Sequence, residues 1–163
     1  MKVKIISDST CDLSPQLIQK YDISIVPLYV VLGDVSAKDG IEATPEDIYK
    51  YVDETGKLPK TSAPNVDDFA AEFKKWRDLD YEVVHLNISS DFSSSYLNAC
   101  AAADEVGGVE VVDTRNLSTG SGLVVLHAAE MAQKGASAKE IAEECRDLTG
   151  RVEASFVVDS IDY

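Results

Sequence analysis

Short apolar segments rich in Val and Ile alternate with longer segments of helical periodicity along this chain of 163 residues. The expected strands lie at residues 3–6, 23–32, 83–88, 109–112 and 152–158. Strands that alternate with helices are joined by crossovers and pair in parallel, and such a sheet needs helices on both faces to cover it. We therefore expect residues 1–163 to form a single α/β domain with a three-layer (α/β/α), Rossmann-like parallel sheet.

Helix and loop boundaries follow from proline and from capping residues. Ser14-Pro15 and Thr44-Pro45 each predict a helix start, because the hydroxyl caps a free amide and proline needs no amide hydrogen at the first helical position. Pro27 should divide residues 23–32 into two short strand pieces, since it cannot donate to a sheet. Residues 33–43 combine turn formers with mixed polarity and predict a loop.

Charge and cysteine content argue against several classes of function. Fifteen basic and twenty-nine acidic residues give a net charge of −14, which repels nucleic acid and anionic membranes, so we expect no nucleic-acid partner. The three cysteines form no CxxC pair and no cluster with histidine, which predicts a reducing cytoplasm and no metal site. No apolar segment approaches the roughly 20 residues of a membrane span.

A cluster of serines lies between the strand expected at residues 83–88 and an Ala-rich helix expected at 98–103. Its members are Ser89, Ser90, Ser93, Ser94 and Ser95. The first amides of a helix lack internal partners and carry the positive end of its dipole, so an anionic head group is stabilised there. A simple capping role is the alternative, although a single serine would suffice for it.

Two further segments present hydroxyls in defined positions. Thr61 lies between Pro59 and Pro64, whose restricted φ angles should hold it in an extended segment. The sequence Asp8-Ser9-Thr10 follows the first strand and invites comparison with a phosphoryl-transfer aspartate. It lacks a second aspartate two positions later, and a loop that bonds its own backbone is at least as good an interpretation.

The loops that follow the strands, at residues 7–10, 89–95 and 113–115, should converge at the carboxyl edge of the sheet, where ligands bind in such folds. His85 and His127 lie in apolar surroundings and are interpreted as core or packing residues. A hydrolase is disfavoured, because no G-x-S-x-G turn is present and no catalytic triad can be assembled.

Six motifs occur in order across nearly the whole chain. They are ISDSTCDL from Ile6, VPLYV from Val26, Asp39-Gly40, PKTSAP from Pro59, ISSDFSSSY from Ile88 and VVDTRNLSTGSGL from Val111. This ordered set resembles the DegV family of bacterial fatty-acid-binding proteins. The resemblance implies a long-chain fatty acid such as palmitate, with its carboxylate bound by Thr61 and Ser93. Additional ligand contacts are expected among Ser62, Ser94, Ser95, Asp8, Ser9 and Thr10.

The same resemblance implies a lipid-binding protein without catalytic residues or a cofactor. It would present the fatty acid to a separate catalytic subunit, a fatty acid kinase, whose acyl phosphate product feeds phospholipid synthesis. The alternatives are a phosphoryl- or acyl-transfer enzyme that uses the Asp8-Ser9-Thr10 loop, and a protein-interaction module.

Two departures from the family pattern bear on these expectations. The usual glycine and threonine after Ser93 are Ser94 and Ser95 here, which keeps a hydroxyl but adds a side chain where backbone approaches ligand. Family members also continue through a Gly-Gly-Arg segment into a second domain, which the sequence ending at Tyr163 does not include. We therefore expect this chain alone to retain a fatty acid weakly or not at all, and a longer parent protein to bind it.

Overall fold

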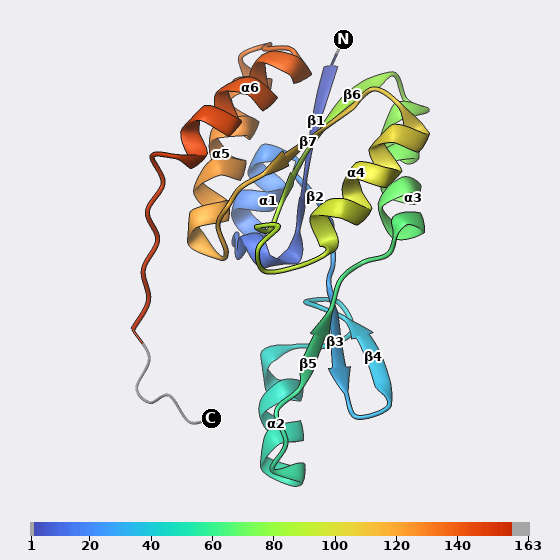
Figure 1. Ribbon diagram of the computed structural model, residues 1–163, viewed down its shortest axis with the longest axis vertical. Coiled ribbons are helices and arrows are strands. Elements are labelled where there is room, and N and C mark those ends of the chain that lie inside the picture. The colour runs from blue at the N-terminus through green and yellow to red at the C-terminus, as the bar shows by residue number, and fades with distance from the viewer. Residues whose placement is uncertain (1, 158–163) are drawn as a thin grey trace.

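A four-stranded parallel sheet forms the centre of the larger of two lobes in the computed structural model, which describes residues 2–157 (Figure 1). The strands are β1 (Lys2–Asp8), β2 (Ser24–Val26), β6 (Tyr81–Asn87) and β7 (Val109–Asp113). Their order in the sheet is β2-β1-β6-β7, and all the pairs are parallel. The carboxyl ends of all these strands therefore lie at the same edge, as the alternating pattern predicts.

Helices cover both faces of this sheet, which confirms the expected three layers. One face carries α1 (Pro15–Tyr21), α5 (Thr119–Gln133) and α6 (Ala138–Thr149), and the other carries α3 (Val66–Arg77) and α4 (Ser95–Val106). Phe69 and Phe73 of α3 are fully buried against Val83 of β6, whereas Val124 and Ile141 fill the core on the opposite face. The helices thus remove both faces of the sheet from water.

The predicted helix starts are confirmed in atomic detail. The side chain of Ser14 accepts a hydrogen bond from the amide of Leu17, and Pro15 takes the first helical position. Thr44 and Asp47 form a reciprocal capping box at the start of α2 (Pro45–Thr55). Both satisfy amides that would otherwise lack a partner.

The smaller lobe is an antiparallel sheet that the sequence did not indicate. It consists of β3 (Tyr29–Leu32), β4 (Val35–Lys38) and β5 (Lys60–Ser62) in the order β4-β3-β5, with α2 beside it. The loop expected at residues 33–43 is therefore wrong over β4, which pairs with β3 through the tight turn at Gly33. Only Ala37 of β4 is buried, so the sequence of this strand shows almost no alternation of apolar and polar residues. Its extended conformation depends on pairing with β3.

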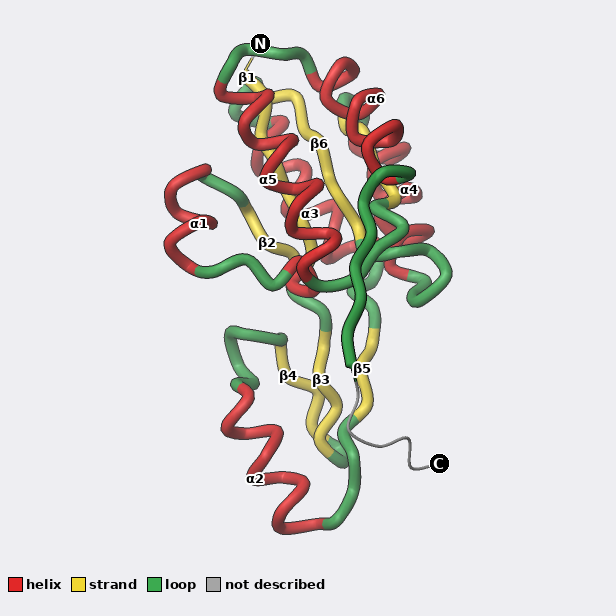
Figure 2. The backbone as a smooth tube through the Cα atoms, turned by 90° about the vertical axis from the view of Figure 1, so that its left-hand side faces the viewer, coloured by secondary structure: helices red, strands yellow, loops and turns green. Residues whose placement is uncertain are grey.

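The chain passes between the lobes twice, at Pro27 and at Pro64 (Figure 2). The predicted break at Pro27 is confirmed, but β2 before it and β3 after it belong to different sheets. Residues 28–63 thus leave the large lobe after β2 and return immediately before α3.

The strand expected at residues 152–158 is wrong over the described residues 152–157. Residues 152–157 follow α6 without forming a strand, and Val158 lies outside the described residues. Phe156 and Val157 are 82% and 99% exposed, so this apolar segment lacks the neighbouring strand that an extended chain needs for its hydrogen bonds. Within residues 2–157, no helix is long and apolar enough to cross a membrane.

Candidate functional site

The three polar loops predicted to converge do meet at the carboxyl edge of the parallel sheet. The Asp8 carboxylate Oδ2 accepts a hydrogen bond from the amide of Ile88 at 2.6 Å, which joins the loop after β1 to the serine turn. The Ser90 hydroxyl donates to Asp113 Oδ2, also at 2.6 Å, which joins the same turn to the end of β7. The serine turn, residues 89–95, therefore lies at the centre of this edge.

Three of the five serines hold the turn in shape. Ser89 Oγ accepts a hydrogen bond from the amide of Asp91, and Ser90 makes the contact to the end of β7 described above. Ser95 is fully buried and donates to Asn87 Oδ1 at 3.2 Å. Ser90 and Ser95 donate their hydroxyl hydrogens within the protein, and Ser89 is buried, so these three serines serve the structure of the turn.

Ser93 and Ser94 are placed differently. Ser93 Oγ accepts a hydrogen bond from the amide of Ser95 at 3.1 Å, so its own hydroxyl hydrogen is free to donate to an anion. Ser94 is the N-cap residue of α4, but its side chain makes no capping hydrogen bond to the described residues. Ser94 therefore does not perform the simple capping role that was the alternative for the serine turn.

The start of α4 also differs from the starts of most other helices. Side-chain caps are present on α1, α2, α3 and α6. In the described part of the chain, the N-cap residues of α4 and α5 make no such bond, although Ser93 accepts from the first amide of α4, and both helices begin at the carboxyl edge of the sheet. Amide hydrogens left without a side-chain acceptor at a helix start favour a bound anion.

Thr61 lies in the small lobe, at the centre of β5, where it is exposed and pairs with Val30 of β3. Ser62 is also exposed. Two residues after this strand, the carbonyl of Pro64 accepts a hydrogen bond from Asn98 Nδ2 of α4, at 2.7 Å. Thr61 and Ser93 therefore lie in different lobes.

The Asp8-Ser9-Thr10 loop bonds mainly to its own backbone and to its neighbours. Asp8 is 1% exposed, and its Oδ1 accepts from both the amide and the hydroxyl of Thr10, at 3.0 and 2.5 Å. Ser9 Oγ accepts from the amide of Leu28 at 3.1 Å. The interpretation as a self-bonded loop therefore holds for Asp8 Oδ1 and Thr10, whereas Asp8 Oδ2 and Ser9 bind the backbone of other segments.

His85 is a core residue, as expected. Its ring lies 5.1 Å from that of Phe69 and 5.4 Å from that of Phe73, and Nε2 lies 2.9 Å from Asn87 Oδ1. Removal from water lowers the pKa of His85 below its ordinary value. No group of metal-binding side chains occurs among residues 2–157.

His85 should make the protein less stable in acid. Its folded-state pKa is depressed, so the unfolded chain binds the proton first, and its stabilising effect is complete above pH 6.5 and declines as the pH falls below it. Between pH 7.5 and 5.5 this group should therefore lower the unfolding free energy, by at most about 1.4 kcal/mol. Urea unfolding at both pH values, with wild type and His85→Gln, measures the effect. An equal pH dependence in the two proteins would contradict it.

The comparison with known families gives this geometry its context. A family model described as "Uncharacterised protein, DegV family" matches residues 2–163. The chain belongs to the DegV family. The predicted resemblance is therefore confirmed over almost the whole sequence.

Relatives of this DegV chain include proteins described by what they bind. A Thermotoga maritima "Fatty acid-binding protein" is 40% identical over 170 residues, which cover 100% of this chain and 59% of the relative. A Thermus thermophilus DegV structure, described by its fatty acid binding, is 35% identical with a TM-score of 0.84 and covers 92% of this chain and 54% of that one. A stearic acid-binding protein from Eubacterium ventriosum is 31% identical with a TM-score of 0.80, covering 88% and 52% of the two chains.

The chain thus spans less than two thirds of the length of these relatives. The structural matches confirm the mixed α/β architecture, with a parallel sheet flanked by helices. Sequence reasoning did not find Asn98, which bonds to the crossing segment between the two lobes at Pro64. Its one signal is a polar amide in an otherwise Ala-rich helix, where asparagine is a poor helix former.

Proposed function

We propose that this DegV chain binds a long-chain fatty acid such as palmitate through its carboxylate, with Thr61 and Ser93 as the principal donors. The observation that carries the proposal is the hydroxyl of Ser93, which accepts from the first amide of α4 and donates to none of the described residues, at a helix whose N-cap residue Ser94 makes no capping bond to them. A hydroxyl that donates to a carboxylate contributes about 1.5 to 3 kcal/mol. Ser62 and Ser94 are exposed beside these two residues, whereas Ser95 and Asp8 are buried and already engaged.

Apolar side chains around the carboxyl edge are suited to the acyl chain. They are Phe92, Leu97, Leu117 and Leu123, with exposed fractions of 67%, 66%, 38% and 58%. Exposed apolar groups that gather around a polar centre mark a binding surface. Burial of a palmitate tail would release on the order of 12 kcal/mol before the costs of association, so the tail would set affinity and the hydroxyls orientation.

We further propose that the bound acid is presented to a separate fatty acid kinase subunit, in the cytoplasm, for acyl phosphate formation and phospholipid synthesis. The chain then supplies no catalytic residue. The engagement of both Asp8 oxygens supports this division of labour, since a nucleophilic carboxylate would first have to give up its donors. The separate kinase is expected to produce acyl phosphate only when both proteins and ATP are present.

Replacement of both hydroxyls should weaken palmitate binding by tenfold or more, because two charge-assisted hydrogen bonds are lost. The variant is Thr61→Val with Ser93→Ala, which preserves side-chain volume closely. Titration of [1-¹³C]palmitate into the protein, followed by the ¹³C shift of the carboxyl carbon, reports both affinity and head-group environment. This measurement detects weak binding as well as strong binding.

Ser36→Ala is the matched control, because Ser36 is an exposed hydroxyl on β4 of the same small lobe. Hexadecanol, which has the same tail without a charge, should bind wild type and the double variant nearly equally. Unchanged palmitate binding by the double variant would refute the two assignments. ATP turnover by the chain alone would favour the transferase alternative instead.

A further inference from the structure

The small lobe is an excursion of the chain, and few polar contacts hold it against the large lobe. Both crossings carry a proline, Pro27 and Pro64, whose fixed φ angles make the connecting segments stiff (Figure 2). The core of the small lobe is limited to Val30, Ala37 and Ala43 with two partly buried neighbours, and it forms a cluster separate from the two cores of the large lobe. Its orientation must therefore depend on specific contacts near the crossings.

The first of these contacts is made by Asn98. Its side-chain amide donates to the carbonyl of Pro64 at 2.7 Å, while its own backbone amide donates to the carbonyl of Ser94. Asn98 thus lies one helical turn beyond the serine turn, and Pro64 lies just after Thr61 along the chain. One hydrogen bond joins the two segments that carry the proposed head-group donors.

The second contact is made by Tyr29 of β3. Its hydroxyl lies 3.1 and 3.2 Å from the two carboxylate oxygens of Asp68 in α3. Asp68 is itself fixed, because it forms a reciprocal capping box with Asn65. Partial burial and the neighbouring carboxylate raise the pKa of Tyr29, so the hydroxyl keeps its proton and remains a donor.

The contact of Tyr29 reaches Thr61 through the small sheet. Tyr29 of β3 pairs with Ser62 of β5, and Val30 pairs with Thr61. The anchor at Tyr29 therefore fixes β3, and β3 fixes the neighbouring strand that contains Thr61. Tyr29 anchors β3 to α3, and Asn98 anchors the segment that follows β5 to α4. Two anchors on different helices define an orientation, which a single anchor cannot do.

We propose that Asn98, Tyr29 and Asp68 are positioning residues that hold the small lobe so that Thr61 and Ser93 can bind one carboxylate together. The role assigned to Thr61 rests on the proposed function, whereas the coupling of the two lobes can be tested without any ligand. The side chains of Asn98 and Tyr29 belong to none of the buried clusters, so their replacement should leave the core of each lobe intact.

Residual dipolar couplings of backbone amides test the coupling of the lobes directly. In the wild-type chain, amides of β3–β5 and amides of the parallel sheet should fit one alignment tensor. In the double variant Tyr29→Phe, Asn98→Ala, the small-lobe couplings should shrink and require a tensor of their own. Tyr49→Phe and Asp104→Ala are matched controls at exposed positions on α2 and α4, and should behave as wild type.

Palmitate titration tests the consequence for the site. The Tyr29→Phe, Asn98→Ala variant should bind [1-¹³C]palmitate about tenfold more weakly than wild type, as expected when one charge-assisted donor no longer reaches the carboxylate. Thr61→Val alone should give a similar loss, and its addition to the double variant should cost less than about twofold more, because both changes remove the same contact. Hexadecanol binding should not change.

The two proposals fail in different ways. If palmitate binds neither to wild type nor to a longer form that adds the second domain of the family, the proposed function fails, and the dipolar couplings alone decide whether these residues orient the lobes. A single tensor in the double variant would overturn the positioning role. Additive losses from Thr61→Val and the double variant would also overturn it, since independent effects cannot act through one donor.

Discussion

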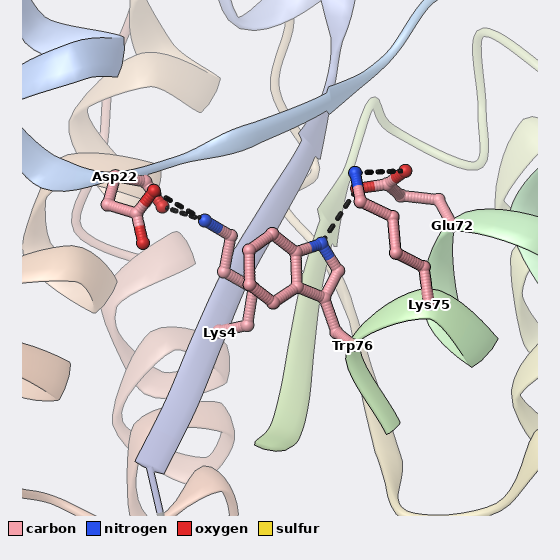
Figure 3. Close-up of polar contacts among 5 residues, drawn as sticks. All are labelled: Lys4, Asp22, Glu72, Lys75 and Trp76. Carbon is pink, nitrogen blue, oxygen red and sulfur yellow. Dashed lines mark hydrogen bonds and ion pairs between the residues drawn. The ribbon is translucent and has the colours of Figure 1, made fainter. Parts of the chain in front are cut away.

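Lys4→Ala should destabilise the protein by about 2 to 4 kcal/mol, because a buried side chain and its polar contacts are lost together. Lys4 is 2% exposed in β1, and its ammonium group lies 2.8 Å from Asp22 Oδ1 and 3.9 Å from the centre of the Trp76 ring (Figure 3). It also donates to the backbone carbonyl of Asp22, at the turn between α1 and β2. The variant should therefore loosen the α1–β2 connection and the packing of α3. Urea unfolding at pH 7.5 measures the change.

Lys2→Ala is the matched control, since Lys2 lies on the same strand but is exposed, and its loss should cost well under 1 kcal/mol. Lys4→Met keeps much of the side-chain volume and should fall between the two. A Lys4→Ala protein as stable as Lys2→Ala would show that the ion pair and the aromatic contact contribute nothing net.

The large lobe was predictable because its signals are local and repeated. Apolar runs give the strands, hydroxyl–proline pairs give two helix starts, and the alternation of strands with helices leaves parallel pairing as the consistent arrangement. Lys4 shows the limit of this reasoning. A lysine within a strand argues against a strand that is buried on both faces. Only the contacts of Lys4 to Asp22 and Trp76, which are distant in sequence, explain how its side chain is buried.

The small lobe was not predictable for a related reason. Its strands are short, and β5 has no buried residue, so its extended form depends on pairing with β3 and not on an apolar pattern. At the site, sequence indicated which loops meet, because the carboxyl ends of parallel strands must share an edge. It could not rank the five serines, since only the folded structure shows that Ser90 and Ser95 donate within the protein and that Ser89 is buried, whereas Ser93 is partly exposed.

Gly122→Ala should destabilise the protein by about 1 to 3 kcal/mol, although helix propensity alone predicts the opposite. Alanine is favoured over glycine in a helix interior by roughly 1 kcal/mol. A Cβ atom at Gly122 of α5, however, would lie 2.6 Å from the backbone carbonyl oxygen of Cys11 and 3.2 Å from Leu13 Cδ2. A backbone oxygen cannot rotate away, so α5 would have to move from the loop after β1.

Gly120→Ala is the informative comparison, because the atoms nearest to its added Cβ belong to side chains, those of Asn116 and Ala154. The Asn116 side chain can rotate, so this variant should lose less stability than Gly122→Ala. The same displacement of α5 should weaken the hydrogen bond between Ser121 and Thr114, 2.9 Å apart, and so disturb the carboxyl edge beside the serine turn. A Gly122→Ala protein that is more stable than wild type would mean that α5 is free to shift and that close packing does not fix this edge.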